Sequence, residues 1–311
     1  MSSSRPTVCV FGATGSQGGA LAHQLRGLNW NVRAIVRTLS DPNSEALKAA
    51  GVQLTHGDWD NNEALQVAIS GCDKLFLCLL PDFEDQDRER RQATNIVKIA
   101  HASGVKQVVA STSLTSFVLE DGLLEPGSLM HRHSASKKAI EQAVADGGFD
   151  YWTFLRPAFF MANFLEPKVA RYPEPRDHGT WTTSMTPESE LALVDHVDIA
   201  KFAIAAFQDP ERFNGKAIGL ASELLTVQQT LDQLGTSIGR PLRAIFLTDE
   251  ELAEARKKKS NVFTNSQPSL RLMANYVNLE QLADTVTLTT FKQFLDREQS
   301  NVKATYQSLD F

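Results

Sequence analysis

The sequence TVCVFGATGSQGG, residues 7–19, joins an apolar strand-like run to a glycine-rich turn. Glycines placed directly after a strand and at the start of a helix have the spacing that pyrophosphate binding requires. Gly12 is expected to permit the tight turn, Gly15 to let the backbone approach the phosphates, and Gly18 to let the helix pack closely on the strand. The segment therefore predicts a dinucleotide site. The alternative is a turn with a purely structural role.

Around this segment, short β-branched runs alternate with longer amphipathic stretches through the first half of the chain. This alternation is typical of a parallel sheet with helices on both faces. Strands are expected at Thr7–Phe11, Asn31–Val36, Val52–Thr55, Lys74–Leu80, Val105–Ser111 and Tyr151–Leu155. Helices are expected at Gly18–Gly27, Asn62–Ser70, Asp87–Ser103 and His133–Asp146. Right-handed crossovers between these elements give a doubly wound, Rossmann-type α/β sheet.

The regular alternation fades after residue 157, and the chain up to about residue 191 is rich in Pro, Gly, Thr and aromatic residues. We expect irregular structure there, over the carboxyl edge of the sheet. Further elements are expected at Asp198–Phe207, Lys216–Leu220, Thr226–Ile238, Thr248–Lys258 and Thr290–Arg297, of which the second is a strand and the others are helices.

These elements predict a nucleotide-binding domain at residues 1–157, with its sheet completed by parts of 192–222. Residues 158–311 are expected to form mainly a smaller α+β lobe. A cleft between this lobe and the sheet is the expected place for a second ligand.

Composition limits the classes of partner. The 311 residues carry a net charge of −6, which provides no broad positive field for nucleic acid or an anionic membrane. The basic run at residues 257–259 is interpreted as a solvated helix face. No stretch of the sequence is apolar over transmembrane length, so we expect no transmembrane helix, and we expect no secretory signal. Its three cysteines lack CxxC spacing, so we expect no metal site, no disulfide and a cytoplasmic location.

The end of the second predicted strand indicates which dinucleotide binds. A protein that prefers NAD usually has an acidic residue there, whereas this chain has Arg37. A guanidinium matches phosphate geometry, so Arg37 favours NADP(H), and the alternative is a surface arginine. Arg33, four positions earlier, is expected to be solvated rather than to assist.

Other strand ends supply further candidates for cofactor contacts. Asp58 is expected either to accept from the adenine amino group or to cap a helix, and Trp59 to flank the adenine ring. Leu80 and Pro81 are expected beside the nicotinamide ribose. The acidic run at residues 82–87 is interpreted as helix capping. The full set expected to contact the cofactor is Gly12, Thr14, Gly15, Ser16, Gln17, Gly18, Arg37, Asp58, Trp59, Leu80, Pro81, Ser111 and Lys137.

His133 and Lys137 are four residues apart on a predicted helix and would share one face near Ser111. The lysine ammonium can hydrogen-bond the nicotinamide ribose and stabilise charge on a substrate. The imidazole has an ordinary pKa close enough to neutrality to donate a proton. Both residues are therefore catalytic candidates, and the alternative for each is a residue on an ordinary helix surface.

The segment at residues 156–164 would bring bulky apolar side chains to the nicotinamide end. Phe159, Phe160, Asn163 and Phe164 are the candidate substrate-pocket residues, with Asn163 available to orient a substrate. Core packing is the alternative. In the segment Asp195-His196-Val197-Asp198, which looks like a charge relay, Asp198 is expected to cap a helix.

Together these motifs resemble the NmrA-like branch of the atypical short-chain dehydrogenases. The resemblance rests on residues 12–19, 32–37, 57–58, 155–157 and 194–200. It implies NADP(H) binding and spans both enzymes and regulators, from isoflavone reductase-like proteins to the nitrogen-metabolite-repression regulator. Ordinary short-chain dehydrogenases have a Tyr-x-x-x-Lys pair. Here His133 stands at the tyrosine place and Lys137 at the lysine place, so tyrosine-based proton transfer does not carry over.

We expect an NADPH-dependent reductase that passes hydride to an activated C=O, C=N or C=C bond of a small organic substrate. The apolar segment from Phe159 to Phe164 favours an enzyme. The alternative is a non-catalytic NADP(H) redox sensor, in which cofactor occupancy changes binding to a protein partner. Nucleic acid and membranes are not expected partners, and a homodimer is compatible with the sequence.

Overall fold

The computed structural model describes residues 5–82, 85, 87–257 and 269–307. The chain divides into two compact units, each built from more than one stretch of sequence. The first unit comprises Met1–Ser116, Arg132–Arg156 and Ile199–Ile218. The second unit comprises Phe117–His131, Pro157–Asp198 and Gly219–Phe311.

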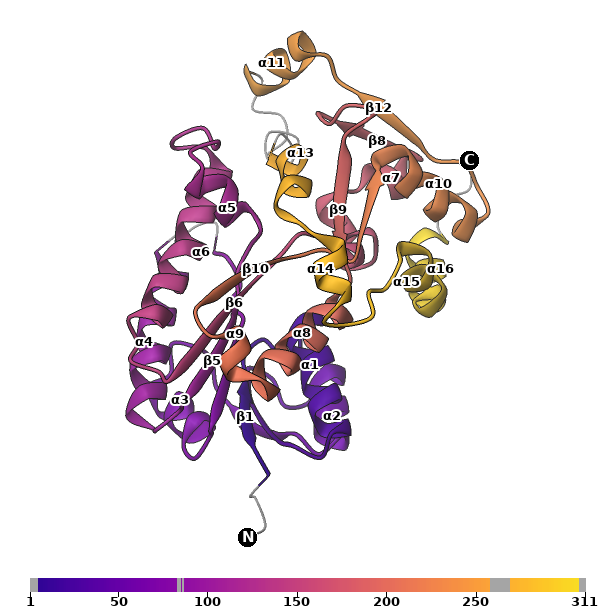
Figure 1. The fold of residues 1–311 in the computed structure, drawn as a ribbon. Helices are drawn as coiled ribbons and strands as arrows, with labels where there is room; N and C mark the ends of the chain where they lie inside the picture. Colours follow the sequence, from indigo (N-terminus) through magenta and orange to yellow (C-terminus); the bar gives the residue numbers. More distant parts are fainter. Residues whose placement is uncertain (1–4, 83–84, 86, 258–268, 308–311) are drawn as a thin grey trace. The chain divides into compact units, whose positions relative to one another are not determined.

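The first unit is centred on a seven-stranded sheet with the order β10-β6-β5-β4-β1-β2-β3 (Figure 1). Its strands are β1 (Thr7–Val10), β2 (Asn31–Val36), β3 (Gln53–His56), β4 (Lys74–Leu77), β5 (Gln107–Ser111), β6 (Tyr151–Pro157) and β10 (Lys216–Leu220). The pairs β1–β2, β2–β3, β1–β4, β4–β5 and β5–β6 are all parallel. The chain order reverses beside β1, so the predicted doubly wound α/β fold is confirmed.

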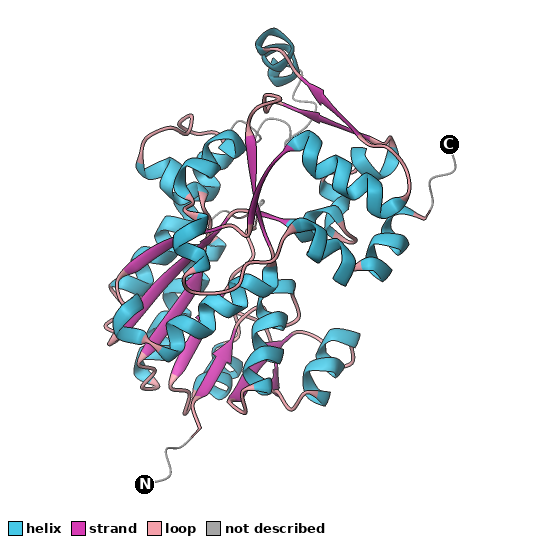
Figure 2. Ribbon diagram, turned by 45° about the vertical axis from the view of Figure 1, so that its right-hand side comes forward, coloured by secondary structure: helices cyan, strands magenta, loops and turns pink. Residues whose placement is uncertain are grey.

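Helices lie on both faces of this sheet, with α1 and α2 on one side and α3 and α4 on the other (Figures 1 and 2). The helices along this part of the chain are α1 (Ser16–Gly27), α2 (Pro42–Ala49), α3 (Asn62–Ile69), α4 (Arg88–Ala102), α5 (Thr115–Glu120), α6 (Leu129–Ala145), α8 (His196–Gln208) and α9 (Pro210–Phe213). Parallel strands joined by crossover helices must bury both sheet faces, which explains the near-continuous apolar runs of β1, β4 and β5.

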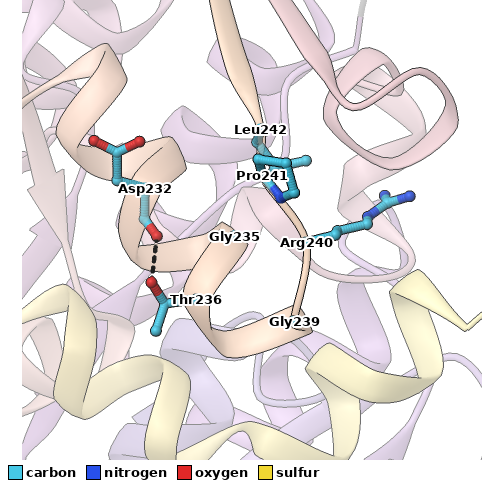
Figure 3. A pocket seen from close by; sticks show the side chains of 7 residues that line it. All are labelled: Asp232, Gly235, Thr236, Gly239, Arg240, Pro241 and Leu242. Carbon is cyan, nitrogen blue, oxygen red and sulfur yellow. Dashed lines mark hydrogen bonds between the residues drawn. The ribbon is translucent and has the colours of Figure 1, made fainter.

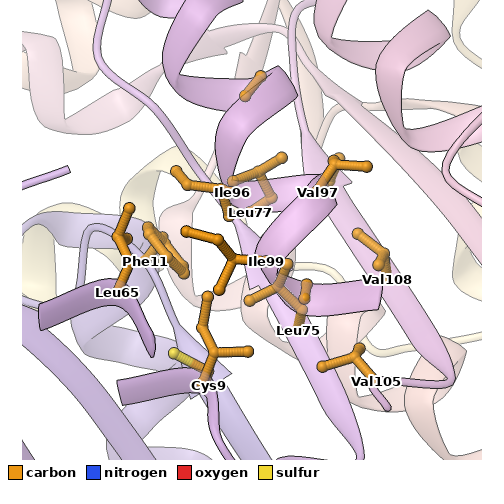
Figure 4. Close-up of a cluster of buried hydrophobic side chains, with 14 of the residues drawn as sticks. Cys9, Phe11, Leu65, Leu75, Leu77, Ile96, Val97, Ile99, Val105 and Val108 are labelled. Carbon is orange, nitrogen blue, oxygen red and sulfur yellow. The ribbon is translucent and has the colours of Figure 1, made fainter. Parts of the chain in front are cut away.

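One hydrophobic core lies between the sheet and the helices α3, α4 and α6. Figure 4 shows part of this core, where Phe11 and Leu77 from the sheet meet Leu65 of α3 and Ile96 of α4. All four side chains are almost fully buried. This packing holds the carboxyl ends of β1 and β4 in a defined position.

Several predicted boundaries were wrong. Strand β4 ends at Leu77 rather than at residue 80, so the segment after it is a loop. Helix α6 begins at Leu129, four residues before the predicted start. Helix α2 was not predicted, although Asp41 caps it and Pro42 occupies its first turn, which is a recognised helix-start signal.

The second unit contains two small sheets. The strands are β7 (Phe159–Phe160), β9 (Glu190–Val194) and β11 (Glu223–Thr226) in one sheet, and β8 (Thr180–Thr183) and β12 (Arg243–Phe246) in the other. The described helices, including 3₁₀ turns, are η1 (Met161–Phe164), η2 (Lys168–Arg171), α7 (Glu174–Asp177), α10 (Val227–Ile238), α11 (Asp249–Lys257), α13 (Leu270–Met273), η4 (Ala274–Tyr276), α14 (Leu279–Ala283), α15 (Phe291–Arg297) and α16 (Gln299–Tyr306). The segment from 157 to 191, predicted to be irregular, contains short strands and turns.

The helix predictions in this unit were largely correct. Helices α10 and α15 match the predicted helices at Thr226–Ile238 and Thr290–Arg297, and Thr226 and Thr290 form capping boxes at their starts. Helix α11 ends at Lys257, and the rest of the basic run at 257–259 lies outside the described residues.

The described residues contain neither a membrane-spanning helix nor a metal-binding cluster. Among them, no helix is long and apolar enough to span a membrane. The same residues contain no cluster of His, Cys, Asp and Glu that could hold a metal ion. Cys9, Cys72 and Cys78 are buried free thiols.

Candidate functional site

The glycine turn after β1 is as tight as its sequence predicts. Gly12 adopts a φ of +69°, which favours glycine, and its carbonyl accepts a 2.9 Å hydrogen bond from the amide of Gly15. A β-carbon at Gly18 would lie 2.4 Å from the Gly12 carbonyl oxygen. The first turn of α1 therefore lies directly against the turn that follows β1.

The start of α1 is suited to an anion. Gly15 occupies the N-cap position, no side chain caps the helix there, and no acidic residue stands in its first turn. The first amides of a helix lack partners within the helix and carry partial positive charge. The turn therefore presents backbone amides that a phosphate would fit.

Neighbouring elements hold this turn. Gln17, on the first turn of α1, accepts a 2.6 Å hydrogen bond from the hydroxyl of Ser111 at the end of β5. The side chain of Asn43 on α2 donates to the carbonyl of Thr14 at 3.1 Å. Ser16, the first residue of α1, is half-buried. The residues predicted to surround the phosphates are thus close together in the first unit.

The two arginines of β2 differ in role. Arg37 follows the strand and is exposed, with its guanidinium available at the carboxyl end of the sheet. Arg33 instead donates to the carbonyl of Ser70, the C-cap residue of α3. The expectation that Arg33 is solvated was wrong, because its side chain hydrogen-bonds the backbone at the C-terminal end of α3.

The end of β3 forms a close turn beside β2. The amide of Gly57 donates to the carbonyl of Val36 at 3.0 Å, and a β-carbon at this glycine would lie 2.4 Å from that of Ala64. Asp58 is exposed and accepts from the amide of Asp60, while Asn61 caps α3. The capping alternative for Asp58 was therefore wrong.

Trp59, two residues beyond Gly57, is half-buried. Its ring packs at an angle against Phe11 with the ring centroids 6.3 Å apart. It also contacts the hydrophobic core below the sheet. This packing fixes the indole at the carboxyl edge and leaves part of its surface accessible.

The loop after β4 exposes one large apolar residue. Leu80 is 65% exposed, whereas Leu79 is buried and Pro81 is half-buried. A leucine in this position next to the glycine turn is suited to contact with a bound molecule.

The acidic run beyond this loop does not cap α4 as predicted. Asp87 occupies the N-cap position without a side-chain capping bond. Its carboxylate pairs with Arg90, while Asp82 pairs with Arg88 and Asp85 with Arg91. Residues 83, 84 and 86 of this run lie outside the described residues.

Helix α6 brings Lys137 to the same loop. The ammonium is buried and donates to the carbonyl of Leu79 at 3.2 Å. It also forms an ion pair with Glu89 in the first turn of α4. The second oxygen of this carboxylate accepts a 2.9 Å hydrogen bond from Ser136. Glu89 was not predicted as a site residue, since nothing in its local sequence distinguishes it from the surface acids nearby.

His133 lies one turn before Lys137 and is half-buried. Burial, together with the positive charge of Lys137, lowers the pKa of His133 to about 3. The imidazole is therefore neutral at physiological pH. The expectation of an imidazole with a pKa near neutrality that donates a proton was wrong, because partial burial of the ring and the nearby Lys137 ammonium disfavour its protonated form.

The polar residues after β5 form two chains of hydrogen bonds. Ser113 contacts the hydroxyl of Thr115 at 2.8 Å, and Ser134 of α6 donates to the same hydroxyl at 2.7 Å. Thr112 donates to Glu141, which also holds Arg156 through a buried pair with an oxygen–nitrogen distance of 2.7 Å. These bonds fix α6 against the end of β5.

The predicted substrate-pocket residues lie in the second unit, and two of them are core residues. Phe159 and Phe164 are buried, and both rings pack against Trp181. Phe160 is half-buried beneath the ammonium of Lys168, and Asn163 is half-buried on η1. The pocket prediction was wrong for Phe159 and Phe164, because ring contacts take up their faces; core packing, the alternative, is what the structure has.

The segment that looks like a charge relay is structural. Asp195 caps α8 by accepting from the amide of Val197 and pairs with both terminal nitrogens of Arg297. Asp198, predicted to cap this helix, is instead buried and accepts from Ser222 and Thr289. The predicted role of Asp198 was therefore wrong, because the residue that caps the helix is Asp195, three residues earlier.

A shallow pocket of about 400 Å³ lies elsewhere in the second unit (Figure 3). Its lining residues are Asp232, Gly235, Thr236, Gly239, Arg240, Pro241 and Leu242. Thr236 donates to the backbone of Asp232, and Gly239 ends α10 in a left-handed conformation. The pocket thus lies at the C-terminal end of α10, and none of the predicted site residues lines it.

The fold and glycine turn define a Rossmann-type α/β protein. A profile of the NmrA-like family matches residues 4–300, so the chain belongs to the NmrA-like family, as predicted. It is 27% identical over 320 residues to the NmrA-like family domain-containing oxidoreductase himF of Aspergillus japonicus. That match covers 94% of this chain and 92% of the relative.

The solved structures that share the fold include a reductase and a regulator. Triphenylmethane reductase of Citrobacter sp., solved with NADP(H), matches with a TM-score of 0.71 at 21% identity, covering 94% of this chain and 99% of that chain. NmrA, a negative transcriptional regulator solved with NADP, matches with a TM-score of 0.66 at 17% identity, covering 99% and 93%. The same fold therefore occurs in a reductase and in a regulator.

Proposed function

We propose that the protein is an NADPH-dependent reductase of a small organic molecule with an activated C=O, C=N or C=C bond. The main support for this proposal is that the glycine turn and Lys137 contact the backbone of two consecutive residues, Cys78 and Leu79 respectively. A β-carbon at Gly12 would lie 3.1 Å from the carbonyl oxygen of Cys78, and Lys137 donates to the carbonyl of Leu79. Under this proposal, phosphate binding and charge stabilisation would take place at one edge of the sheet.

In this proposal the residues of the first unit hold NADP(H). The backbone of the turn at Gly12, Gly15 and Gly18 takes the pyrophosphate, and Arg37 takes the 2′-phosphate. Asp58 and Trp59 take the adenine. Support comes from the relationship to an oxidoreductase and from the NADP-bound structures that share the fold.

NADPH, when bound, supplies a hydride. Lys137 would donate a hydrogen bond to the nicotinamide ribose and stabilise negative charge that develops on the substrate. His133, being neutral, would orient a polar group through its N–H or nitrogen lone pair. Leu80 and Pro81 would exclude water from one side of the reacting atoms.

The experiment is single-turnover oxidation of NADPH in the presence of ketones, imines, enones, a quinone and a triphenylmethane dye. We expect oxidation with at least one acceptor, and Lys137→Ala saturated with NADPH should slow it by orders of magnitude. His133→Phe should have a smaller effect. Absence of turnover on the whole panel, with NADPH bound, would contradict the reductase proposal.

The alternative is a redox sensor, and the observation that favours it is the fold shared with NmrA. A pull-down with the oxidised and the reduced cofactor distinguishes the two functions. Partner capture that depends on cofactor redox state, combined with no turnover, would identify a regulator. Turnover without such capture would identify an enzyme.

A further inference from the structure

Lys137 does not stand alone in the candidate site. Its side chain and that of Glu89 are 5% and 2% exposed, so the ion pair between them is almost completely removed from water. Taking two charges out of water is costly unless the remaining hydrogen-bonding groups are satisfied. Here Ser136 and the carbonyl of Leu79 supply those further bonds.

In this arrangement Lys137 keeps one hydrogen-bond donor for a ligand. An ammonium has three N–H donors. One is directed to Glu89 and one to the carbonyl of Leu79, which leaves a third for a ligand. Because Leu79 directly precedes the exposed Leu80, the ammonium is held beside the loop assigned above to the nicotinamide ribose.

Glu89 is placed to make this arrangement rigid. It lies in the first turn of α4, where a carboxylate complements the helix dipole. Both of its oxygens are used, one by Lys137 and one by Ser136. The Glu89 carboxylate therefore links α4 to α6 at Ser136 and Lys137.

We propose that Glu89 is a positioning residue that keeps the Lys137 ammonium charged and directed toward the nicotinamide ribose of bound NADPH. This proposal rests on the proposed function of the same site. Glu89 touches neither cofactor nor substrate and acts only through the lysine. Without the carboxylate, the buried ammonium would lose its balancing charge, and burial disfavours the charged form of a lysine.

The other charged groups around Lys137 do not replace Glu89. His133, one turn earlier on α6, is neutral. Glu141, one turn later, is already bound by Arg156 and Lys138. From the loop after β4, the neighbouring group is the uncharged carbonyl of Leu79.

Glu89→Gln tests the proposal, with Glu141→Gln as the matched control. Both changes remove one negative charge from a buried ion pair that involves α6. The affinity for NADPH is measured by fluorescence titration between pH 6 and pH 10, without substrate. We expect the parent affinity to vary little over this range, and Glu89→Gln to bind about tenfold or more weakly, as loss of a charge-assisted hydrogen bond predicts.

The pH profile is the readout that a merely structural role would not change. In Glu89→Gln, binding should weaken further as the pH rises, because the lysine loses its proton. In Glu141→Gln, the affinity and its pH profile should match those of the parent, whatever happens to thermal stability. Equal NADPH affinity and profile in Glu89→Gln and the parent would overturn the proposal. Tighter binding would also overturn it, because it would mean that Glu89 sequesters the lysine.

Glu89→Asp provides a second variant should Glu89→Gln not fold. It keeps the charge but withdraws it by one methylene, so we expect weaker NADPH binding with the pH profile of the parent. Parent-like affinity in Glu89→Asp would overturn the proposal. A parent protein that binds NADPH but turns over no acceptor would contradict the reductase proposal alone, because the binding assay needs no substrate.

Discussion

A β-carbon at Gly18 would lie 2.4 Å from the carbonyl oxygen of Gly12, so these two glycines are in direct backbone contact across the turn that follows β1. This distance is shorter than any ordinary carbon–oxygen contact. The approach of α1 to β1, and with it the shape of the candidate phosphate cradle, depends on the absence of a side chain at residue 18.

Gly18→Ala should therefore lower the free energy of unfolding by about 1–3 kcal/mol, as overpacking does, and should weaken NADPH binding. Gly27→Ala, at the other end of α1, is the control because nothing lies within 4 Å of the added β-carbon. That change should be neutral or stabilise the protein by up to about 1 kcal/mol. Urea unfolding and NADPH titration measure both effects. Parent-like stability and binding in Gly18→Ala would contradict the geometry of the turn.

Arg37→Ala should remove most of the preference for NADPH over NADH. A charge-assisted hydrogen bond is worth roughly 1.5–3 kcal/mol, which corresponds to about tenfold or more in the ratio of the two dissociation constants. Arg33→Ala is the matched control, because Arg33 lies on the same strand but donates to the carbonyl of Ser70. Calorimetry with both cofactors is the measurement. Equal affinities in the parent protein would remove the basis of the NADP(H) assignment.

Replacing only Lys137 of the buried Lys137–Glu89 ion pair should destabilise the protein more than replacing both residues. Lys137→Met leaves the Glu89 carboxylate buried without its partner, a change that typically costs about 3–5 kcal/mol. The double variant Lys137→Met, Glu89→Gln should be more stable than the single lysine variant. Unfolding free energies of the four proteins give the coupling energy, and additive effects would show that the pair contributes little.

His133 should make the fold sensitive to acid. Its pKa is about 3 in the folded protein, below the ordinary value for histidine, so the unfolded chain takes up a proton that the folded chain does not. Stability should consequently fall as the pH decreases from about 6.5 toward 3. His133→Asn should show a shallower decline in urea unfolding across this range. Parallel curves for the two proteins would mean that the imidazole is freely protonated in the folded state.

Substitution of Phe164 should lower the free energy of unfolding more than substitution of Phe160, because only Phe164 is a core residue. Phe164 is 1% exposed, and Phe164→Ala should lower the free energy of unfolding by about 3–5 kcal/mol. Phe160→Ala should have a smaller effect because that ring is only half-buried. Unchanged stability together with altered turnover in Phe164→Ala would contradict the assignment of Phe164 to the core.

The sheet could be predicted from the sequence because its signals are local. Apolar runs of strand length, separated by amphipathic helices, specify a parallel sheet wherever they occur. The same holds for the capping boxes at Thr226 and Thr290, where one residue and its third neighbour determine the helix start. Strand ends were less accurate, as at Leu77, because the chain leaves the sheet where pairing stops and not where hydrophobicity stops.

The candidate site was predicted only in part. The glycine turn, Arg37 and Lys137 follow from spacing and from position at strand or helix ends. The roles of Arg33 and Asp58 do not, since their partners Ser70 and Asp60 depend on where the neighbouring helix begins or ends. Phe159 and Phe164 have the composition of either a pocket or a core, and only their contacts with Trp181 distinguish the two.

The sequence by itself determined the doubly wound sheet, the glycine turn and the family, because periodicity and glycine spacing act over a few residues. Tertiary structure alone decided that Glu89 meets Lys137, 48 residues along the chain, and that His133 is neutral. A charge pair and a shifted pKa depend on which helices pack together and how much water their packing excludes. No local pattern contains that information.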